Sequence, residues 1–280
     1  MFFVYIADFI YPTIRGGAEH NDKEMLLYLK NKGHSITVVD SPSVSIDFLS
    51  KIDKKYKLII SNFGLMHQDC IKYIQENFDY IIYEHDHKYL LSRNPGKFKD
   101  FIVPKDEILN LQFYQKAKRV FCQSSFHKEI IEKNLNIDNI FNVSGNFWSD
   151  DDLEFIKKLS LKDKKECCSI IYSNNAHKNY NDAIKYCEHK NLSYNVISHP
   201  DYRTFLEKMS ENNCLLFLPK VPETLSRIVV ECRMMNMKVI TNNLVGARGE
   251  PWFSLKGEEL IEHMKNRKAE IIQQIEQAFI

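Results

Sequence analysis

The feature that most constrains this chain is a regular alternation of short apolar runs with longer amphipathic stretches. The apolar runs are brief, rich in β-branched and aromatic residues and nearly continuous in apolarity, which is typical of strands buried on both faces of a parallel sheet. Strands that alternate with helices favour a doubly wound α/β sheet. In the first half of the chain we expect strands at residues 2–7, 57–61, 80–84 and 119–123, and helices at 18–32, 68–77, 105–117 and 125–134.

The same alternation begins again after a charged stretch at residues 149–166. Two α/β domains whose sheets face each other across a cleft are therefore the simplest arrangement. Ligands of such sheets bind beyond the carboxyl ends of the strands, so we expect the functional residues there. In this half we expect strands at 168–173, 194–198, 214–218 and 238–242, and helices at 181–190, 202–212 and 224–235.

The expected organisation is an N-terminal Rossmann-like domain over residues 1–150, a linker over 151–166 and a C-terminal Rossmann-like domain over 167–256. Residues 257–280 form one long amphipathic pattern. We expect a helix there that packs back on the N-terminal domain, with a dimer helix as the alternative.

Composition excludes several classes of protein. A hydrophobic content of 44% in 280 residues is a globular value, and 38 basic against 37 acidic side chains give a net charge of +1, which offers no electrostatic reason to expect a nucleic-acid or anionic-membrane partner. Seven cysteines without a CxxC pair favour a reducing compartment. No run reaches the roughly 18 apolar residues of a membrane-spanning helix, so we expect a cytoplasmic protein, with peripheral membrane attachment left open.

The segment IRGGAEH (14–20) lies between the first expected strand and helix. Adjacent glycines let a backbone approach a ligand closely, and the helix N-terminus behind them offers N–H groups to an anion. Gly16 and Gly17 are therefore candidate ligand contacts, with Arg15 suggesting phosphate. A simple glycine-rich helix start is the alternative.

The segment YEHDHKYLLSRNP (83–95) follows another expected strand. Its titratable cluster, Glu84, His85, Asp86 and His87, stands where ligands of such a sheet bind. A substrate-contacting site, a satisfied polar loop and a metal site are all open, although no third metal ligand with recognisable spacing is present.

Two segments of the second half carry charges suited to a sugar-nucleotide. Lys178 in SNNAHKNYNDAI (173–184) could hold a phosphate, or could be a solvated loop lysine. In LPKVPETLSRIVVEC (218–232), Glu223 precedes the expected helix and Glu231 interrupts its apolar stripe, on the order of 12 Å further along. That span suits the two ends of a sugar-nucleotide, and a carboxylate within an apolar stripe requires a partner.

Together these segments resemble the retaining GT-B glycosyltransferases of family 4. The spacing Glu223-x7-Glu231 is similar to that family's EX7E motif, and GGAE (16–19) to its first glycine loop. RVFCQSSFHKEII (119–131) and FNVSGNF (141–147) resemble the part of the family that leads into its interdomain linker, and Val245-Gly246 its loop after the motif.

The resemblance implies a role for each matching residue. Gly16 and Gly17 would approach the donor phosphate or the acceptor, Glu19 would belong to the same loop, and His85 would lie near the transferred sugar, with Asp86 beside it. Lys178 would neutralise the diphosphate leaving group without a metal, Glu223 would position the sugar and Glu231 would hold the ribose.

One position departs from the family. Where the family has an arginine about five residues before its lysine, this chain has Ser173. The missing charge could come from Arg227, which is preferred because it lies beside Glu223, or from Lys220 or Arg203.

The expected activity is a retaining, metal-independent hexosyl- or pentosyltransferase that needs no cofactor. It would move a sugar from a nucleotide diphosphate sugar, such as a UDP-sugar, to a glycan, a lipid-linked sugar or another hydroxyl, and a nucleic-acid acceptor stays open. The missing arginine keeps a second class open, a non-catalytic sugar-nucleotide-binding or scaffold protein. A sugar-nucleotide epimerase would need a richer acid/base set than His85, Asp86 and His87 supply.

Overall fold

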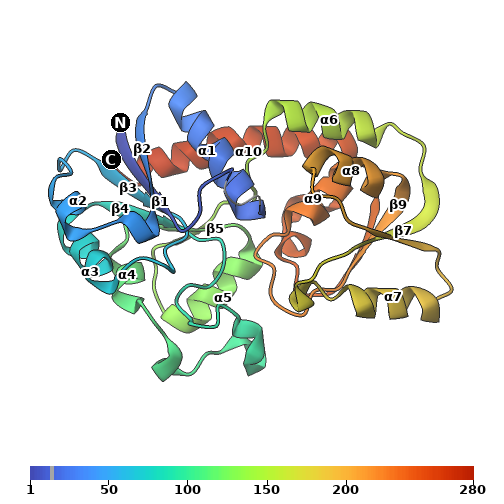
Figure 1. The fold of residues 1–280 in the computed structure, drawn as a ribbon, viewed down its shortest axis with the longest axis horizontal. Helices are drawn as coiled ribbons and strands as arrows, with labels where there is room; N and C mark the ends of the chain where they lie inside the picture. Colours follow the sequence, from blue (N-terminus) through green and yellow to red (C-terminus); the bar gives the residue numbers. More distant parts are fainter. Residues whose placement is uncertain (13–15) are drawn as a thin grey trace. The chain divides into compact units, whose positions relative to one another are not determined.

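The computed structural model describes residues 1–12 and 16–280, and it divides into two compact units. Unit 1 comprises Met1–Phe147 together with Arg267–Ile280, and unit 2 comprises Trp148–Asn266. Each unit contains one sheet in which every pair of neighbouring strands is parallel, with helices along the sheet (Figure 1). The expectation of two doubly wound α/β domains is confirmed.

The sheet of unit 1 has six strands in the order β2-β1-β3-β4-β5-β6. The chain moves to one side of β1 to form β2 and then to the other side for β3 and all later strands, so the strand order reverses between β1 and β3. Such a reversal is where open α/β sheets bind ligands. The strands are β1 Phe2–Ala7, β2 Ser35–Asp40, β3 Lys57–Ile60, β4 Tyr80–Tyr83, β5 Val120–Cys122 and β6 Ile140–Asn142.

Helices cover both faces of this sheet, which explains why its strands are apolar without interruption. Val4 and Ile6 point into one core cluster, and Phe3 and Tyr5 point into another, as the two-residue period of a strand requires. The helices are α1 Gly17–Asn31, α2 Ile46–Ser50, α3 Gln68–Asn77, α4 Leu111–Lys116 and α5 Ser125–Leu135.

The sheet of unit 2 has four strands in the order β10-β9-β7-β8, and its strand order reverses between β7 and β9. Leu215 and Phe217 face one core cluster, while Cys214 and Leu216 face the other. The strands are β7 Lys165–Ile171, β8 Tyr194–Ile197, β9 Asn212–Phe217 and β10 Lys238–Thr241, and the helices are α6 Asp150–Ser160, α7 Tyr180–His189, α8 Tyr202–Ser210 and α9 Arg227–Met234.

The last helix, α10 (Gly257–Gln277), contributes to both cores. Its beginning places Leu260 and Met264 in the core of unit 2, and its end places Ile272 and Ile275 in the core of unit 1. Glu276 accepts hydrogen bonds in unit 1 from Lys32 at 2.8 Å and pairs with His34 at 2.7 Å. The C-terminus therefore lies beside β2 and the N-terminus (Figure 1).

The expected linker over residues 151–166 differs from the structure. Residues 150–160 form α6, because Ser149 caps its N-terminus and Leu153, Ile156 and Leu159 are buried in unit 2. The high charge of this stretch lies on the exposed face of an amphipathic helix.

The expected helix over 105–117 is also shorter than anticipated. Asn110 takes a left-handed conformation and Leu109 donates a backbone hydrogen bond to Tyr89, so the α-helix covers Leu111–Lys116 and a separate 3₁₀ turn covers Lys105–Glu107.

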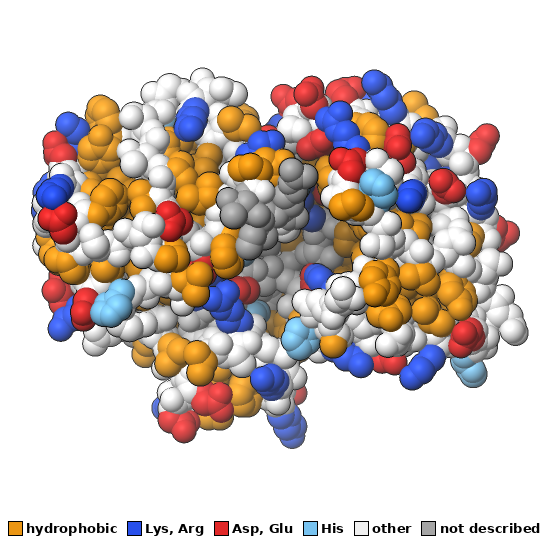
Figure 2. Space-filling view, in the orientation of Figure 1, with side chains coloured by type: hydrophobic (Ala, Val, Ile, Leu, Met, Phe, Trp, Pro, Cys, Tyr) orange, Lys and Arg blue, Asp and Glu red, His pale blue; other side chains and the backbone are white. Residues whose placement is uncertain are grey.

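Charged side chains of both signs are interspersed over the visible face (Figure 2), in keeping with the net charge of +1. Within the described residues, no helix combines the length and apolarity needed to cross a membrane.

Candidate functional site

Lys178 and Glu223 meet where the strand order of unit 2 reverses. Lys178 follows β7 in a 3₁₀ turn, and Glu223 follows β9. Their side chains form an ion pair, with Nζ 2.8 Å from Oε1, and Nζ also lies 5.6 Å from the centre of the Phe217 ring. The side chains are 37% and 15% exposed, so both charges remain accessible to a ligand.

The backbone of Glu223 is fixed by the loop after β10. Its N–H donates to Leu244 O at 2.7 Å, and its carbonyl accepts from Gly246 N at 2.8 Å. A parallel bridge pairs Glu223 with Val245. Val245-Gly246, which resembled the family's loop, thus holds the carboxylate in place.

Helix α9 begins later than expected. It starts at Arg227 rather than at residue 224, with Ser226 in the left-handed region at φ 73°. The separation of about 12 Å assumed a continuous helix between Glu223 and Glu231 and does not apply, because residues 223–226 are not helical. Within the described residues the buried Ser226 Oγ has no hydrogen-bond partner. Both features cost folding free energy and are typical of functional sites.

Glu231 is buried and surrounded by donors. Its Oε1 accepts from Trp148 Nε1 at 2.9 Å and from Tyr202 OH at 2.8 Å, and it lies 3.4 Å from Arg227 Nε. The Arg227 guanidinium lies 4.5 Å from the centre of the Trp148 ring. The sequence predicted that a carboxylate within an apolar stripe requires a partner. Trp148, Tyr202 and Arg227 together fill that role. Burial, and then the Glu231 charge, raise the pKa of Tyr202 well above its ordinary value.

The other cations considered in unit 2 have different partners. Lys220 Nζ lies 3.7 Å from Asp182, and its backbone N–H donates to His177 O in the turn that holds Lys178. Arg203 pairs with Asp152 of α6 at 3.1 Å. Ser173 accepts a hydrogen bond from Asn175 N at 3.1 Å, so it shapes the turn without supplying charge.

In unit 1 the His85 ring is held on both sides. Nε2 lies 2.6 Å from Asp22 Oδ1, and Nδ1 lies 2.7 Å from the side-chain nitrogen of Gln123. Because the Gln123 amide also donates to Asn146 Oδ1 at 3.2 Å, this arrangement assigns the ring proton to Nε2.

Asp22 holds this network together. It accepts hydrogen bonds from the hydroxyls of Tyr5 and Ser61 as well as facing His85. Burial acts to raise the pKa of Asp22, but the His85 ring and the two hydroxyls lower it more, so the pKa lies below its ordinary value. Sequence reasoning missed Asp22 and Gln123, since nothing in the local pattern marks partners 63 and 38 residues away from His85.

Asp86 and Glu84 share one buried cation. Lys88 Nζ lies 2.5 Å from Glu84 and 2.6 Å from Asp86, and Tyr114 OH donates to the second oxygen of Glu84. Burial alone would lower the pKa of Lys88, but Asp86 and Glu84 raise it overall. Of the three alternatives, a polar loop with paired charges therefore fits Glu84 and Asp86.

His87 is buried against the rings of Tyr89 and His127. Neither of its nitrogens has a hydrogen-bond partner within the described residues, and burial lowers the pKa of His87 to about 4. Among residues 1–12 and 16–280, no group of three or more His, Cys, Asp or Glu side chains is arranged to hold a metal ion.

Gly16 and Gly17 open α1 as expected, and Arg15 lies outside the described residues. A Cβ at Gly16 would meet only the end of the Glu19 side chain, which could turn aside. Glu19 is only 8% exposed.

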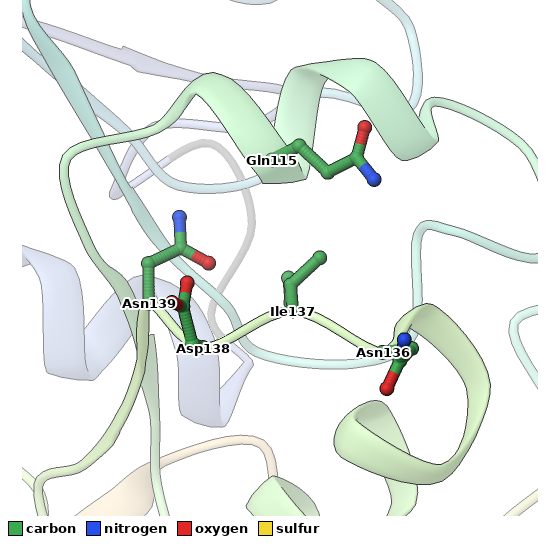
Figure 3. Close-up of a pocket in the computed structure, with 5 residues that line it drawn as sticks. All are labelled: Gln115, Asn136, Ile137, Asp138 and Asn139. Atoms are coloured by element: carbon green, nitrogen blue, oxygen red, sulfur yellow. The ribbon is translucent and has the colours of Figure 1, made fainter.

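Figure 3 shows a pocket of about 410 Å³ at the amino end of β6. Its lining is mostly amide and contains no residue predicted from the sequence. Ligands of an open α/β sheet bind at the opposite, carboxyl ends of the strands, so this pocket is not the candidate site. It is lined by Gln115, Asn136, Ile137, Asp138 and Asn139.

The chain is similar over nearly its whole length to solved glycosyltransferase structures. Sucrose-phosphate synthase from Thermosynechococcus elongatus aligns with a TM-score of 0.64 and 9% identity, covering 99% of each chain. The fold is of the GT-B type.

Two further structures share the GT-B fold. Anabaena HepE in complex with UDP and glucose aligns with a TM-score of 0.53 and 12% identity, over 99% of this chain and 92% of HepE. An alpha-glucosyltransferase in complex with UDP-glucose and DNA containing an abasic site aligns with a TM-score of 0.51 and 12% identity, over 96% of this chain and 90% of the other. No protein-family model and no curated protein sequence matches the chain.

Proposed function

We propose that this protein is a glycosyltransferase that moves a sugar from a nucleotide diphosphate sugar to a hydroxyl acceptor. The observation that carries the proposal is the Lys178–Glu223 pair, which lies at the strand-order reversal of unit 2 in a GT-B fold. A cation for the leaving phosphate and a carboxylate for sugar hydroxyls are there within 2.8 Å of each other.

In this proposal the acceptor oxygen forms a bond to the anomeric carbon as the bond from that carbon to the diphosphate breaks. The hydroxyl proton passes to the departing diphosphate. Lys178 and the first turn of α9, at whose N-terminus the Ser226 side chain makes no cap in the described structure, stabilise the charge that develops on the diphosphate, so no metal is required. Glu223 orients the transferred sugar, which keeps its configuration as in the family 4 enzymes that the sequence resembles.

The second cation of the phosphate site is proposed to be Arg227. Its side chain is 9% exposed, held by Glu231 and placed against Trp148, so little conformational entropy remains to be lost on binding. In this role Glu231 positions Arg227, while its contact with the donor ribose stays a proposal from the family resemblance.

UDP-glucose is the first donor to test, because two of the GT-B neighbours were solved with UDP and glucose or with UDP-glucose. Calorimetric titration with UDP-, GDP- and ADP-sugars is expected to show saturable binding of at least one donor. Binding to none of them would refute the proposal.

The alternative is a non-catalytic sugar-nucleotide-binding protein, favoured by Ser173 at the family's arginine position. It predicts donor binding with no release of free nucleotide, even by slow hydrolysis. Nucleotide release that disappears in Glu223→Ala would exclude it. Glycans, lipid-linked sugars and DNA are the acceptor classes to add, DNA because one neighbour was solved with it.

A further inference from the structure

One edge of the sheet in unit 2 is formed by β8. The strand order β10-β9-β7-β8 gives β8 a single neighbour, β7. Backbone N–H groups on the β7 side donate to Ser193 O at 2.8 Å and to Ile197 O at 2.9 Å, so the odd-numbered residues bond to β7. The N–H and C=O groups of Tyr194 and Val196 therefore point away from the sheet, and no other strand of the described chain pairs with them.

Exposed apolar side chains gather at this edge. Three of the four large hydrophobic side chains that are exposed in unit 2 lie in β8 or next to it. Val196, 43% exposed, is within β8, and Leu192, 38% exposed, lies just before it. Tyr172, 42% exposed, donates its backbone N–H to Ile197 O. An apolar surface gathered in one place is typical of a contact with another molecule.

The edge also lacks a common protection against pairing. Charged side chains on an edge strand discourage the addition of another strand, and Tyr194–Ile197 contains none. The three other edge strands each carry or contact a charge. β2 ends at Asp40 and β10 begins at Lys238. In β6, the Phe141 ring lies 4.5 Å from the Arg119 guanidinium.

The backbone of β8 is complementary to itself. Two outward-facing residues separated by one residue let a second copy pair antiparallel, about a two-fold axis at Asn195. Tyr194 of each copy would then exchange both backbone hydrogen bonds with Val196 of the other, and their side chains would form aromatic and β-branched cross-strand pairs. Residues near the axis face their own copies in such an interface, so an uncharged strand brings no like charges together.

We propose that β8 is the interface of a homodimer, in which the sheets of two copies join through an antiparallel pair of β8 strands. A second copy is the partner because one register satisfies the outward backbone groups of both strands and covers the exposed apolar side chains of both. Asn195 then lies opposite Asn195 of the other copy. This assembly does not depend on the proposed function.

Sedimentation velocity of the full chain over a series of concentrations tests the interface. We expect a concentration-dependent species of twice the 33.1 kDa mass of the chain. Asn195→Glu and Asn195→Lys each place two like charges at the axis, so each variant alone should dimerise at least ten-fold more weakly. An equimolar mixture of the two should regain the dimer, because a carboxylate would then face an ammonium group. Asn266→Glu makes the same substitution on an exposed residue of α10 and should leave the dimer unchanged.

Val196→Pro provides an independent variant. It removes an N–H that β7 does not bind, and proline is tolerated on an edge strand, so the chain should fold and stay monomeric. An unmodified chain that is monomeric at every concentration would overturn the proposal. A dimer that persists in the Asn195 variants and in Val196→Pro would overturn it as well, and so would folded Asn195 variants that stay monomeric when mixed. Circular dichroism establishes that each variant is folded.

Discussion

Nζ of Lys178 lies 2.8 Å from Oε1 of Glu223, so the two charged groups that a sugar-nucleotide would need are paired with each other. The pair neutralises the site in the absence of a ligand. A donor would then replace this ion pair with two contacts, its phosphate facing the lysine and its sugar hydroxyls donating hydrogen bonds to the carboxylate.

Breaking this pair is expected to affect function far more than stability. Because both side chains are partly exposed, Glu223→Ala should lower the free energy of unfolding by less than about 1 kcal/mol. Nucleotide release from UDP-glucose should fall roughly a hundred-fold, as when a group that stabilises the transition state is removed. Urea denaturation and a nucleotide-release assay on the same preparation measure the two effects, and a large loss of stability would contradict the first expectation.

Glu231→Ala, in contrast to Glu223→Ala, should reduce stability strongly. Glu231 is 2% exposed and contacts Trp148, Tyr202 and Arg227, so its removal takes away a buried acceptor that all three side chains share. We expect a loss of about 3 kcal/mol in the free energy of unfolding. Urea denaturation beside Glu223→Ala provides the comparison, and equal stability of the two variants would show that the buried contacts carry little energy.

Stability should fall as the pH falls from about 6.5 to about 4, and His87 should contribute to the loss. Burial lowers the pKa of His87 to about 4, so in this range the unfolded chain binds a proton that the folded chain excludes. The loss from this group should reach about 3 kcal/mol at the acidic end.

The His87 contribution is measured by urea denaturation at several pH values. His87→Phe should flatten the profile in part, since burial also lowers the pKa of His127 and that group loses stability in the same direction. A variant with the same pH dependence as the unmodified chain would show that His87 does not contribute.

The end of α10 should be essential to unit 1. Ile272 is fully buried beside Phe3 and Tyr5, and Ile272→Ala should cost about 3 kcal/mol through lost burial and the cavity that remains. The exposed neighbour Gln273→Ala is the control. Hydrogen exchange should report faster opening of β1 and α1 in the Ile272 variant alone.

Much of the fold followed from local patterns in the sequence. Phe2–Ala7 was recognisable as a strand because both of its faces are buried, which makes the run continuously apolar. Ser35–Asp40 was missed because β2 is an edge strand in which no residue is fully buried and Ser35 and Thr37 are exposed. The start of α9 was misplaced because the left-handed conformation of Ser226 has no signature in a serine.

Motif spacing pointed to candidate residues of the site but not to their contacts. Lys178 and Glu223 were both candidates from the sequence, but their contact depends on β7 and β9 lying side by side in the sheet. The partners of Glu231 and His85 come from distant segments, and tertiary packing alone brings Trp148 and Asp22 to them. For the cluster at residues 84–87 the sequence left a substrate contact, a polar loop and a metal site open, and Lys88 shows that Glu84 and Asp86 belong to a polar loop whose charges are paired.

Calorimetric titration of UDP-glucose into the unmodified chain, Lys178→Ala and Lys220→Ala tests the central claim most directly. Lys220 lies on the next loop and carries the same charge, but its side chain is 57% exposed and pairs with Asp182. We predict saturable binding to the unmodified chain and to Lys220→Ala, and at least ten-fold weaker binding to Lys178→Ala. Equal affinity in all three proteins, or none in any, would contradict the assignment of the Lys178–Glu223 pair as the donor site.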